Sequence, residues 1–335
     1  MCTTGGTADR TAYDFTIVTG VTVRVPAKLN LQLAVGPPRA DGYHDLVTVF
    51  HAVSLLDEIT AEPAQRDGIT VTGEGADRVP ADRDNLALRA ATALRKTLAG
   101  RAPAGGRVHI TIAKRIPVAA GLAGGSADAA AALVACNELW DGGLSQSQLL
   151  EVAARVGSDV AFALLGGTAV GRGRGERLTQ ALAPATQYHW VLAFADGQLS
   201  TSEVYAALDR LRGRGGRGDG PREIAQPELD AALMSALRSG DARLVGRTLS
   251  NDLQSAAVSL FPALRKTLAA GLELGALGAL VSGSGPTCVF LAASADRALD
   301  LAASLSGAGV CRAVARVSGP VPGAAVVAAR GDRLP

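Results

Sequence analysis

The sequence predicts an α+β protein with two domains. A chain of 335 residues, 48% of them hydrophobic, is long enough to bury two cores. Two observations carry the prediction. Residues 108–135 read as a strand, a glycine-rich loop and an alanine-rich helix, and residues 280–317 alternate β–α–β around a glycine turn, which favours a split βαβ, ferredoxin-like domain. We therefore expect a first domain at 21–183 and a second at 184–320.

The composition indicates a folded protein and excludes several classes. The formal net charge is only +2, which does not favour a nucleic-acid partner. The chain contains no apolar run of 18 residues and does not begin with a basic segment followed by an apolar one, so we expect neither a membrane span nor a signal peptide. The cysteines have neither metal-binding nor disulfide-rich spacing, which fits a reducing cytoplasm: Cys2, Cys136, Cys288 and Cys311.

The first domain begins with alternating valines. Residues 1–20 show no sustained period, so we expect a mobile extension there. From Val21 the alternation predicts a strand that ends at Pro26, followed by a second strand over 31–35. The other expected elements are a strand at 46–50, two short strands within 59–71, an amphipathic helix over 86–98 capped by Asp84 or Asn85, helices that open at Ser145 and Ser158, and a hairpin within 168–182.

The second domain alternates strands and helices. We expect a strand at 190–194, a helix capped by residues 201–203, helices around 228–238, 241–249 and 262–273, two strands within 280–291, a helix at 296–305 and a strand at 310–317. The tract 212–222 contains only Arg, Gly, Asp and Pro and predicts a flexible loop. An RNA contact there is weakly supported, because no aromatic residue is interleaved. Residues 321–335 are expected to form a C-terminal tail.

Residues 114–127 have the features of a phosphate-binding loop. Alternating apolar residues over 108–112 predict a strand, and Pro117 stops it because proline has no N–H to donate. The glycines that follow allow a sharp turn and close backbone approach: Gly121, Gly124 and Gly125. The helix from Ser126 offers unpaired N–H groups, the positive end of its dipole and a hydroxyl to a phosphate or metal. A simple tight turn fits the same pattern, and neither Walker A nor the dinucleotide fingerprint matches.

Lys28 and Asp159 are candidates for chemistry on a phosphate acceptor. Lys28 follows the first predicted strand and is either an exposed lysine on a sheet face or a cation that neutralises phosphate charge and lowers the pKa of an attacking hydroxyl. Asp159 lies in the first turn of a predicted helix, where the dipole stabilises its ionised form. It is either an N-terminal cap or a carboxylate that orients a hydroxyl or accepts its proton.

Tyr43 and His44 follow the turn signal Asp41-Gly42, in a chain with only 4% aromatic residues. A tyrosine at such a turn either covers the edge of a core or stacks on a nucleobase. In the second case the neighbouring imidazole is placed to hydrogen-bond the base. The residues alone leave both readings open.

Three separated segments are similar, in order and spacing, to the three motifs of the GHMP kinases, which include galactokinase, homoserine kinase and mevalonate kinase: 26–31, 117–127 and 282–287. Four further segments resemble the branch that acts on 4-diphosphocytidyl-2-C-methyl-D-erythritol in the non-mevalonate isoprenoid pathway: 39–44, 84–86, 114–117 and 157–160. The resemblance spans about residues 22–317. It implies an N-terminal domain of the ribosomal protein S5 domain 2-like fold and a C-terminal ferredoxin-like domain.

The resemblance also implies the reaction and its residues. The γ-phosphate of ATP would move to the 2-hydroxyl of the methylerythritol group, with Asp159 taking or directing the hydroxyl proton while Lys28 lowers the hydroxyl pKa. The implied ATP-binding residues are Asn85, Lys114, Pro117, Val118, Ala119, Ala120, Gly121, Leu122, Ala123, Gly124, Gly125, Ser126 and Ala127. The implied substrate-binding residues are Asn30, Tyr43, His44, Thr201, Tyr205, Gly283, Ser284 and Gly285. Mg²⁺ is implied by ATP, but no acidic ligand pair is evident, so its ligands stay unassigned.

The sequence departs from the family in places. Ala119 and Ala120 stand where glycines often occur, Ser202 stands where relatives have proline, and the tract 212–222 is an insertion. One alternative is a GHMP kinase for another small alcohol, against which Tyr43 and His44 argue. The other is a nucleic-acid-binding module, which rests on fold analogy and is opposed by the near-neutral charge. We expect ATP and a cytidine diphosphate-linked small molecule as partners, with no nucleic acid or membrane; the oligomeric state is not specified.

Overall fold

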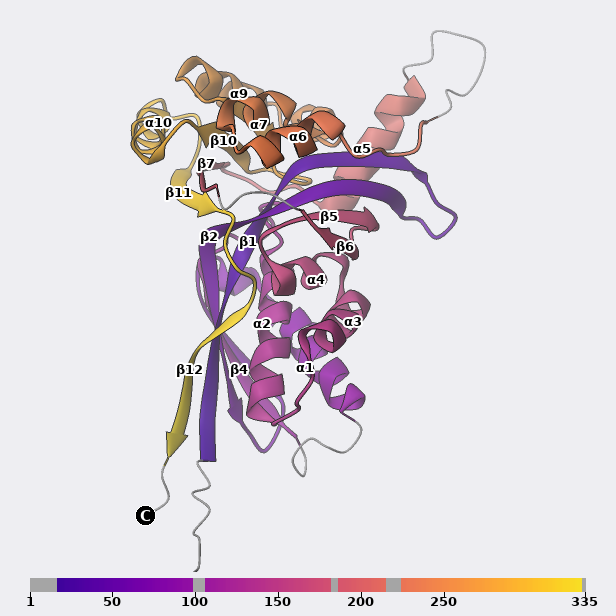
Figure 1. Cartoon of the computed structure of the whole chain (residues 1–335), viewed down its shortest axis with the longest axis vertical. Coiled ribbons are helices and arrows are strands. Elements are labelled where there is room, and N and C mark those ends of the chain that lie inside the picture. The colour runs from indigo at the N-terminus through magenta and orange to yellow at the C-terminus, as the bar shows by residue number, and fades with distance from the viewer. Residues whose placement is uncertain (1–16, 99–105, 182–185, 215–223, 333–335) are drawn as a thin grey trace, which may run out of the picture.

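The computed structural model describes residues 17–98, 106–181, 186–214 and 224–332. They form an eight-stranded sheet covered by helices and a four-stranded sheet with its own helices, at opposite ends of the view in Figure 1. The predicted α+β fold class is confirmed. The domain boundary at residue 184 stays a prediction.

The larger sheet is built around a long antiparallel pair, β1 (Ile17–Pro38) and β2 (His44–Pro63). Its order is β12-β1-β2-β4-β3, while β5 pairs with β2 and β6, and β8 pairs with β1. The remaining strands of this sheet are β3 (Gly68–Gly73), β4 (Val108–Lys114), β5 (Thr168–Gly173), β6 (Arg177–Gln180), β8 (Ser250–Asn251) and β12 (Ala325–Asp332). β1 and β2 extend from this sheet towards the second one (Figure 1).

β1 is one continuous strand of 22 residues, although the sequence predicted two strands separated at Pro26. The register with β2 shifts between Pro26 and Ala27. Such a bulge is one of the few places in a sheet where a residue without an N–H is tolerated. β1 also begins at Ile17, within the segment expected to be a mobile extension. β2 likewise runs for 20 residues without the predicted interruption between 50 and 59.

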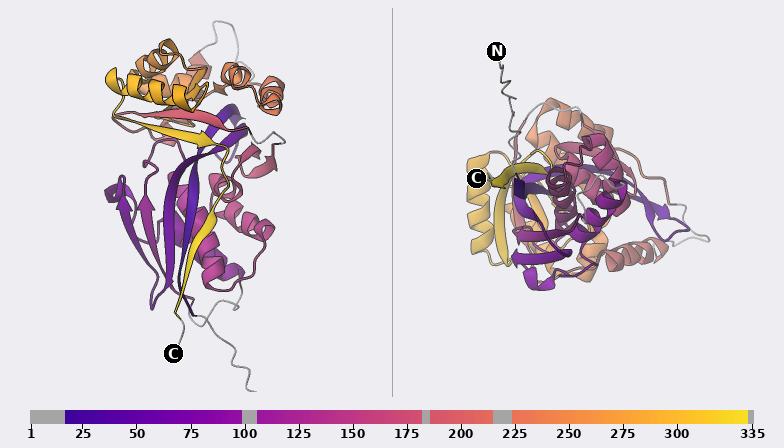
Figure 2. Two further views of the ribbon diagram at one scale, coloured as in Figure 1. Left: turned by 60° about the vertical axis from the view of Figure 1, so that its left-hand side comes forward. Right: turned by 90° about the horizontal axis from the view of Figure 1, so that it is seen from below.

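Helices pack against one face of the larger sheet (Figures 1 and 2). They are α1 (Leu86–Thr97), α2 (Gly124–Leu139), α3 (Gln146–Val156) and α4 (Ser158–Leu165), with a short 3₁₀ turn, η1 (Ala76–Arg78). The alanines of α2 from Ala127 to Ala135 are almost completely buried. Their small side chains let α2 approach β1 and β2 closely, which fixes the position of the helix N-terminus.

The smaller sheet has the order β11-β7-β10-β9 with all neighbours antiparallel, which is the strand order of a split βαβ, ferredoxin-like domain. Its strands are β7 (Tyr188–Phe194), β9 (Gly278–Val281), β10 (Cys288–Ala292) and β11 (Ala313–Gly319). Its helices are α5 (Thr201–Arg214), α6 (Ala231–Ser239), α7 (Ala242–Thr248), α8 (Gln254–Leu260), α9 (Ala263–Glu273) and α10 (Ala295–Gly307). The expected C-terminal domain fold is confirmed, with α8 as an additional helix.

Two predicted segments have a different outcome. The tail expected at 321–335 contains β12, which pairs antiparallel with β1 and so returns the chain to the first sheet. The predicted loop at 212–222 begins with the last residues of α5, and 215–222 lie outside the described residues. Among the described helices, none combines the length and apolar character that a bilayer crossing requires.

Candidate active site

A cavity of about 1010 Å³ is lined by residues of both domains. The N-terminal domain contributes Lys28, Asn30, the turn after β1, the loop before α2 and the first residues of α4. The C-terminal domain contributes the start of α5 and the glycine turn between β9 and β10. The three segments that resemble GHMP motifs therefore meet at one place.

The loop between β4 and α2 presents the N-terminus of a 16-residue helix to this cavity. Gly124, Gly125 and Ser126 form the first turn, where backbone N–H groups have no carbonyl partner within the helix, and all three line the cavity. Ala119 and Ala123 adopt left-handed backbone conformations, with φ of 55° and 57°. The loop thus takes a shape that alanine disfavours by about 1–2 kcal/mol per residue, so the surrounding packing must impose it.

A glycine turn of the second domain, Ser282–Pro286, packs on the same loop. Gly121 has a φ of +74°, and a Cβ there would collide with the carbonyl oxygen of Ser282. The Ser282 hydroxyl donates to the Gly121 carbonyl at 3.1 Å. Asn251 on β8 holds this turn from behind, since its Nδ2 donates to the carbonyls of Val281 and Gly283 at 2.7 Å each. No motif in the sequence singled out Asn251.

Lys28 and Asp159 face each other in the cavity, with 3.8 Å between Nζ and Oδ2. Lys28 is only 8% exposed, so it is not an exposed lysine on a sheet face. Its Nζ donates to Asn30 Oδ1 at 2.6 Å, and Asn30 Nδ2 donates to Thr48 Oγ1 at 2.8 Å. The Lys28 backbone N–H donates to the Leu122 carbonyl at 3.2 Å, which ties this strand to the phosphate loop.

Burial and the neighbouring carboxylate shift the pKa of Lys28 in opposite directions. Burial lowers the pKa of Lys28, and the carboxylate of Asp159 partly opposes that shift. Asp159 lies in the first turn of α4, near the positive end of the helix dipole. A buried ammonium beside a carboxylate can stabilise negative charge that develops on an oxygen placed between them.

Tyr43, His44 and Tyr205 line the same cavity. Tyr43 is 53% exposed, so it does not cover the edge of a core. The rings of His44 and Tyr205 are 5.1 Å apart between centroids, and the guanidinium of Arg174 lies 5.1 Å from the centre of the Tyr43 ring. Burial and the charge of Asp159 raise the pKa of Tyr205, which therefore stays a neutral phenol. Arg174 lies in the turn of the hairpin predicted within 168–182, but it was not predicted as a site residue.

The cavity also contains most of the other residues predicted for ATP and the substrate: Ala119, Ala120, Ala123, Thr201, Gly283, Ser284 and Gly285. Thr201 and Ser284 are hydrogen-bonded through their hydroxyls at 3.0 Å. Six predicted ATP-binding residues do not line it: Asn85, Lys114, Pro117, Val118, Leu122 and Ala127. Their assignment to ATP stays a prediction.

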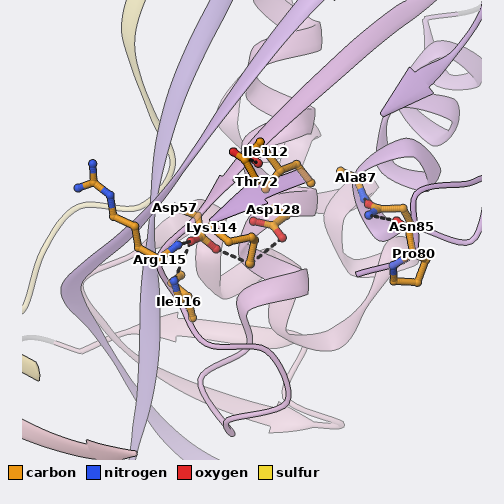
Figure 3. A network of polar contacts seen from close by, with 10 residues as sticks. All are labelled: Asp57, Thr72, Pro80, Asn85, Ala87, Ile112, Lys114, Arg115, Ile116 and Asp128. Carbon is orange, nitrogen blue, oxygen red and sulfur yellow. Dashed lines mark hydrogen bonds and ion pairs between the residues drawn. The ribbon is translucent and has the colours of Figure 1, made fainter. Parts of the chain in front are cut away.

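Asn85 and Lys114 have defined partners elsewhere (Figure 3). Asn85, one of the two predicted caps, caps α1 by accepting the N–H of Ala87 at 2.8 Å, and its Nδ2 donates to the Pro80 carbonyl. Lys114 is buried and donates to Asp57 and Asp128 at 2.5 and 2.8 Å. Asn85 thus stabilises the start of α1, and Lys114 links β4 to the aspartates of β2 and α2.

The buried ion pairs connect three elements beneath the phosphate loop (Figure 3). Asp57 on β2 also accepts the N–H groups of Arg115 and Ile116 at 2.6 and 2.8 Å, immediately before the loop. Burial opposes the charge of Lys114, but the two carboxylates outweigh it and raise the lysine pKa. Burial raises the pKa of Asp128 to about 8, and its Oδ1 has no hydrogen-bond partner among the described residues.

The described residues include no cluster of three or more His, Cys, Asp or Glu side chains able to hold a metal ion. The cavity does offer hard oxygen donors in the Asp159 carboxylate and the Ser126 hydroxyl. Mg²⁺ commonly takes one or two protein ligands and completes its shell with phosphates and water. The donor set fits an ion that arrives with a nucleotide.

Comparison with known proteins agrees with this geometry. The profile of the GHMP kinases N terminal domain matches residues 85–167, and that of the GHMP kinases C terminal domain matches residues 233–311. A homoserine kinase from Cytophaga hutchinsonii shares the fold, with 21% identity and a TM-score of 0.70 over 94% of this chain and 99% of that one. Fold and site together define a GHMP kinase, a class that uses ATP.

Relatives with higher sequence identity identify one family within the GHMP kinases. A 4-diphosphocytidyl-2-C-methyl-D-erythritol kinase of Thermobifida fusca is 56% identical over 92% of this chain and 99% of its own, and one of Nocardia farcinica is 58% identical over 92% and 96%. A crystal structure of 4-(cytidine 5'-diphospho)-2C-methyl-D-erythritol kinase has 34% identity and a TM-score of 0.69 over 88% of this chain and 98% of that one. The chain belongs to the 4-diphosphocytidyl-2-C-methyl-D-erythritol kinase family.

Proposed function

We propose that the protein transfers the γ-phosphate of ATP to the 2-hydroxyl of 4-diphosphocytidyl-2-C-methyl-D-erythritol, a step of the non-mevalonate isoprenoid pathway. One observation carries the proposal: the Lys28–Asp159 pair lies in the same cavity as the N-terminus of α2 and the aromatic pocket around His44. The helix N-terminus suits a triphosphate, the aromatic pocket suits a nucleobase, and the acid–base pair lines the cavity together with both.

In this mechanism Asp159 orients the substrate hydroxyl and accepts its proton as the oxygen attacks the γ-phosphorus. Lys28 stabilises the developing charge on that oxygen and on the transferred group. The contact of Lys28 with Asn30 fixes the ammonium in place. Because the transition state of phosphoryl transfer is loose, positioning and charge stabilisation are the main contributions that the protein can make.

The ATP phosphates bind the N–H groups of Gly124, Gly125 and Ser126, which point out of the first turn of α2. Mg²⁺ would be held mainly by the phosphates and water, with the Ser126 hydroxyl as a protein ligand. When bound, it neutralises charge on the β- and γ-phosphates.

The cytidine end of the substrate occupies the pocket of Tyr43, His44 and Tyr205. The rings provide stacking surfaces, and a guanidinium at Arg174 supplies positive charge beside them for the diphosphate. Thr201 adds a hydroxyl to the same wall. We place the reaction in the cytoplasm, in keeping with free thiols at Cys136, Cys288 and Cys311.

ATP turnover on a panel of alcohols tests the proposal. The panel contains the full substrate, methylerythritol phosphate without the cytidyl group, homoserine and mevalonate. We expect turnover with the full substrate at least about 100-fold above the others in kcat/KM, because the pocket binds the cytidyl group. Equal turnover of the alcohols without that group would instead favour a GHMP kinase for another small alcohol.

A further inference from the structure

His44 is held by a carboxylate from the other domain. Its Nε2 lies 3.0 Å from Asp209 Oδ1, although the two residues are 165 positions apart in the sequence. His44 begins β2 and is 7% exposed, while Asp209 lies on α5 with a side chain that is 38% exposed. Both residues line the cavity. The sequence offered no signal for Asp209.

The same helix supplies the ring that packs on His44. Tyr205 and Asp209 are four residues apart on α5, so they lie on one face of that helix. Tyr205 contacts one surface of the imidazole, at an interplanar angle of 35°, while Asp209 holds its Nε2 edge. The ring can therefore neither tilt nor turn without losing one of these contacts.

An ionised carboxylate only accepts hydrogen bonds, so Nε2 of His44 must carry a proton. Nδ1 then becomes the free edge of the ring, and it has no hydrogen-bond partner among the residues that the structure describes. A histidine oriented by a carboxylate on one nitrogen presents the other nitrogen to a ligand in a fixed direction, as in many metal sites.

We propose that Asp209 is a positioning residue for nucleobase recognition: it fixes the ring and the protonated nitrogen of His44, so that the Nδ1 edge meets the cytosine. The inference rests on the proposed function, because it requires a cytidyl ligand in this pocket. It goes further by assigning a role to a residue that does not itself contact the ligand. Since His44 and Asp209 belong to different domains, the same contact also closes the pocket across their junction.

Cytidine diphosphate is the probe, and its dissociation constant is measured by calorimetry with ADP as the second ligand. Asp209→Ala should weaken cytidine diphosphate binding about tenfold, the effect of one misplaced hydrogen bond, and leave ADP binding within twofold. In the kinase assay the same variant should raise KM for the cytidyl substrate with kcat little changed. Asp209→Glu should restore part of the affinity. Glu203→Ala, which removes an exposed carboxylate from the same helix, is the matched control.

A second measurement does not depend on binding. The chain has only four histidines, so ¹⁵N–¹H spectra can resolve the His44 ring. We expect the Nε2-protonated form in the native protein and a mixture of forms in Asp209→Asn, which keeps the size of the side chain. The inference would be overturned if Asp209→Ala and Glu203→Ala bound cytidine diphosphate with equal affinity, or if the His44 ring of the native protein were already a mixture of the two protonated forms. With either result, kinase activity of the native protein on the cytidyl substrate would leave the proposed function intact. A native protein that turns over no cytidyl substrate would overturn the proposed function as well.

Discussion

Replacing Lys114 by methionine tests the role of the buried ion pairs beneath the phosphate loop. The side chains of Lys114, Asp57 and Asp128 are 2%, 0% and 3% exposed. Methionine keeps the length of the side chain but removes the only cation that the structure places between these carboxylates. Breaking a buried pair by removing one partner costs about 3–5 kcal/mol, and two stranded acids favour the upper end.

The expected change in melting temperature follows from this cost. Unfolding entropies of about 2.1 cal/mol/K per residue give roughly 0.7 kcal/mol/K for a chain of 335 residues that unfolds as one unit. A loss of about 5 kcal/mol then lowers the melting temperature by about 7 °C. Differential scanning calorimetry at pH 7 measures it, and Lys266→Met, at an exposed position on α9, is the matched control.

A second variant separates stranded charge from lost packing. Without Lys114, the buried Asp128 must either remain charged without a cation or take up a proton, and both cost free energy at pH 7. Adding Asp128→Asn to Lys114→Met replaces this acid with a neutral amide, so the double variant should melt at a higher temperature than the single one. If Lys114→Met melted within 1–2 °C of Lys266→Met, the ion pairs would contribute no more than exposed ones typically do, about 0–1 kcal/mol, and the reasoning would be refuted.

Three further predictions concern the site. The folded-state pKa of Asp128, about 8, lies above the pKa of an unfolded aspartate, so the stability that this group contributes is lost as pH rises towards 8. The free energy of unfolding of Asp128→Asn, measured by urea titration, should therefore rise relative to that of the native protein between pH 5 and 8, by up to about 1.4 kcal/mol per pH unit. Unfolding free energies of the two proteins that changed in parallel with pH would contradict this. Gly121→Ala should raise KM for ATP at least about tenfold, because its Cβ meets the Ser282 carbonyl, whereas Gly143→Ala, with similar φ but open space, should not. Asp159→Asn should lower kcat at least about 100-fold with ATP affinity near normal in a nucleotide-binding titration; unchanged turnover would remove Asp159 from the mechanism.

Local signals in the sequence predicted much of the site. The cap at Asn85, the loop before α2 and the turn at Tyr43 depend on residues close together in the chain, and all three appear in the structure. Family resemblance, rather than spacing, paired Lys28 with Asp159. The structure brings these two residues to 3.8 Å although they are 131 positions apart in the sequence.

The features of the fold and site that the sequence did not predict depend on contacts between residues far apart in the chain. Pro26 reads as a strand end until the register shift against β2 is known. Asp209 and Asn251 are unremarkable polar residues in the sequence, and only the packing of α5 and β8 against the other domain gives them partners. Asp57 lies in an ordinary strand pattern, and its role emerges only where β4 and α2 bring Lys114 and Asp128 to it.

The pairing of β12 with β1 has a consequence for how the chain is connected. Ile17 lies opposite Asp332, so the first and last described residues lie at the same end of two neighbouring strands (Figure 1). The ferredoxin-like unit is thus an insertion between two strands of one sheet, and a cut at residue 184 would leave the first sheet without its edge strand. Joining the two ends through a short linker and opening the chain in an exposed turn gives a circular permutant that keeps every strand pair.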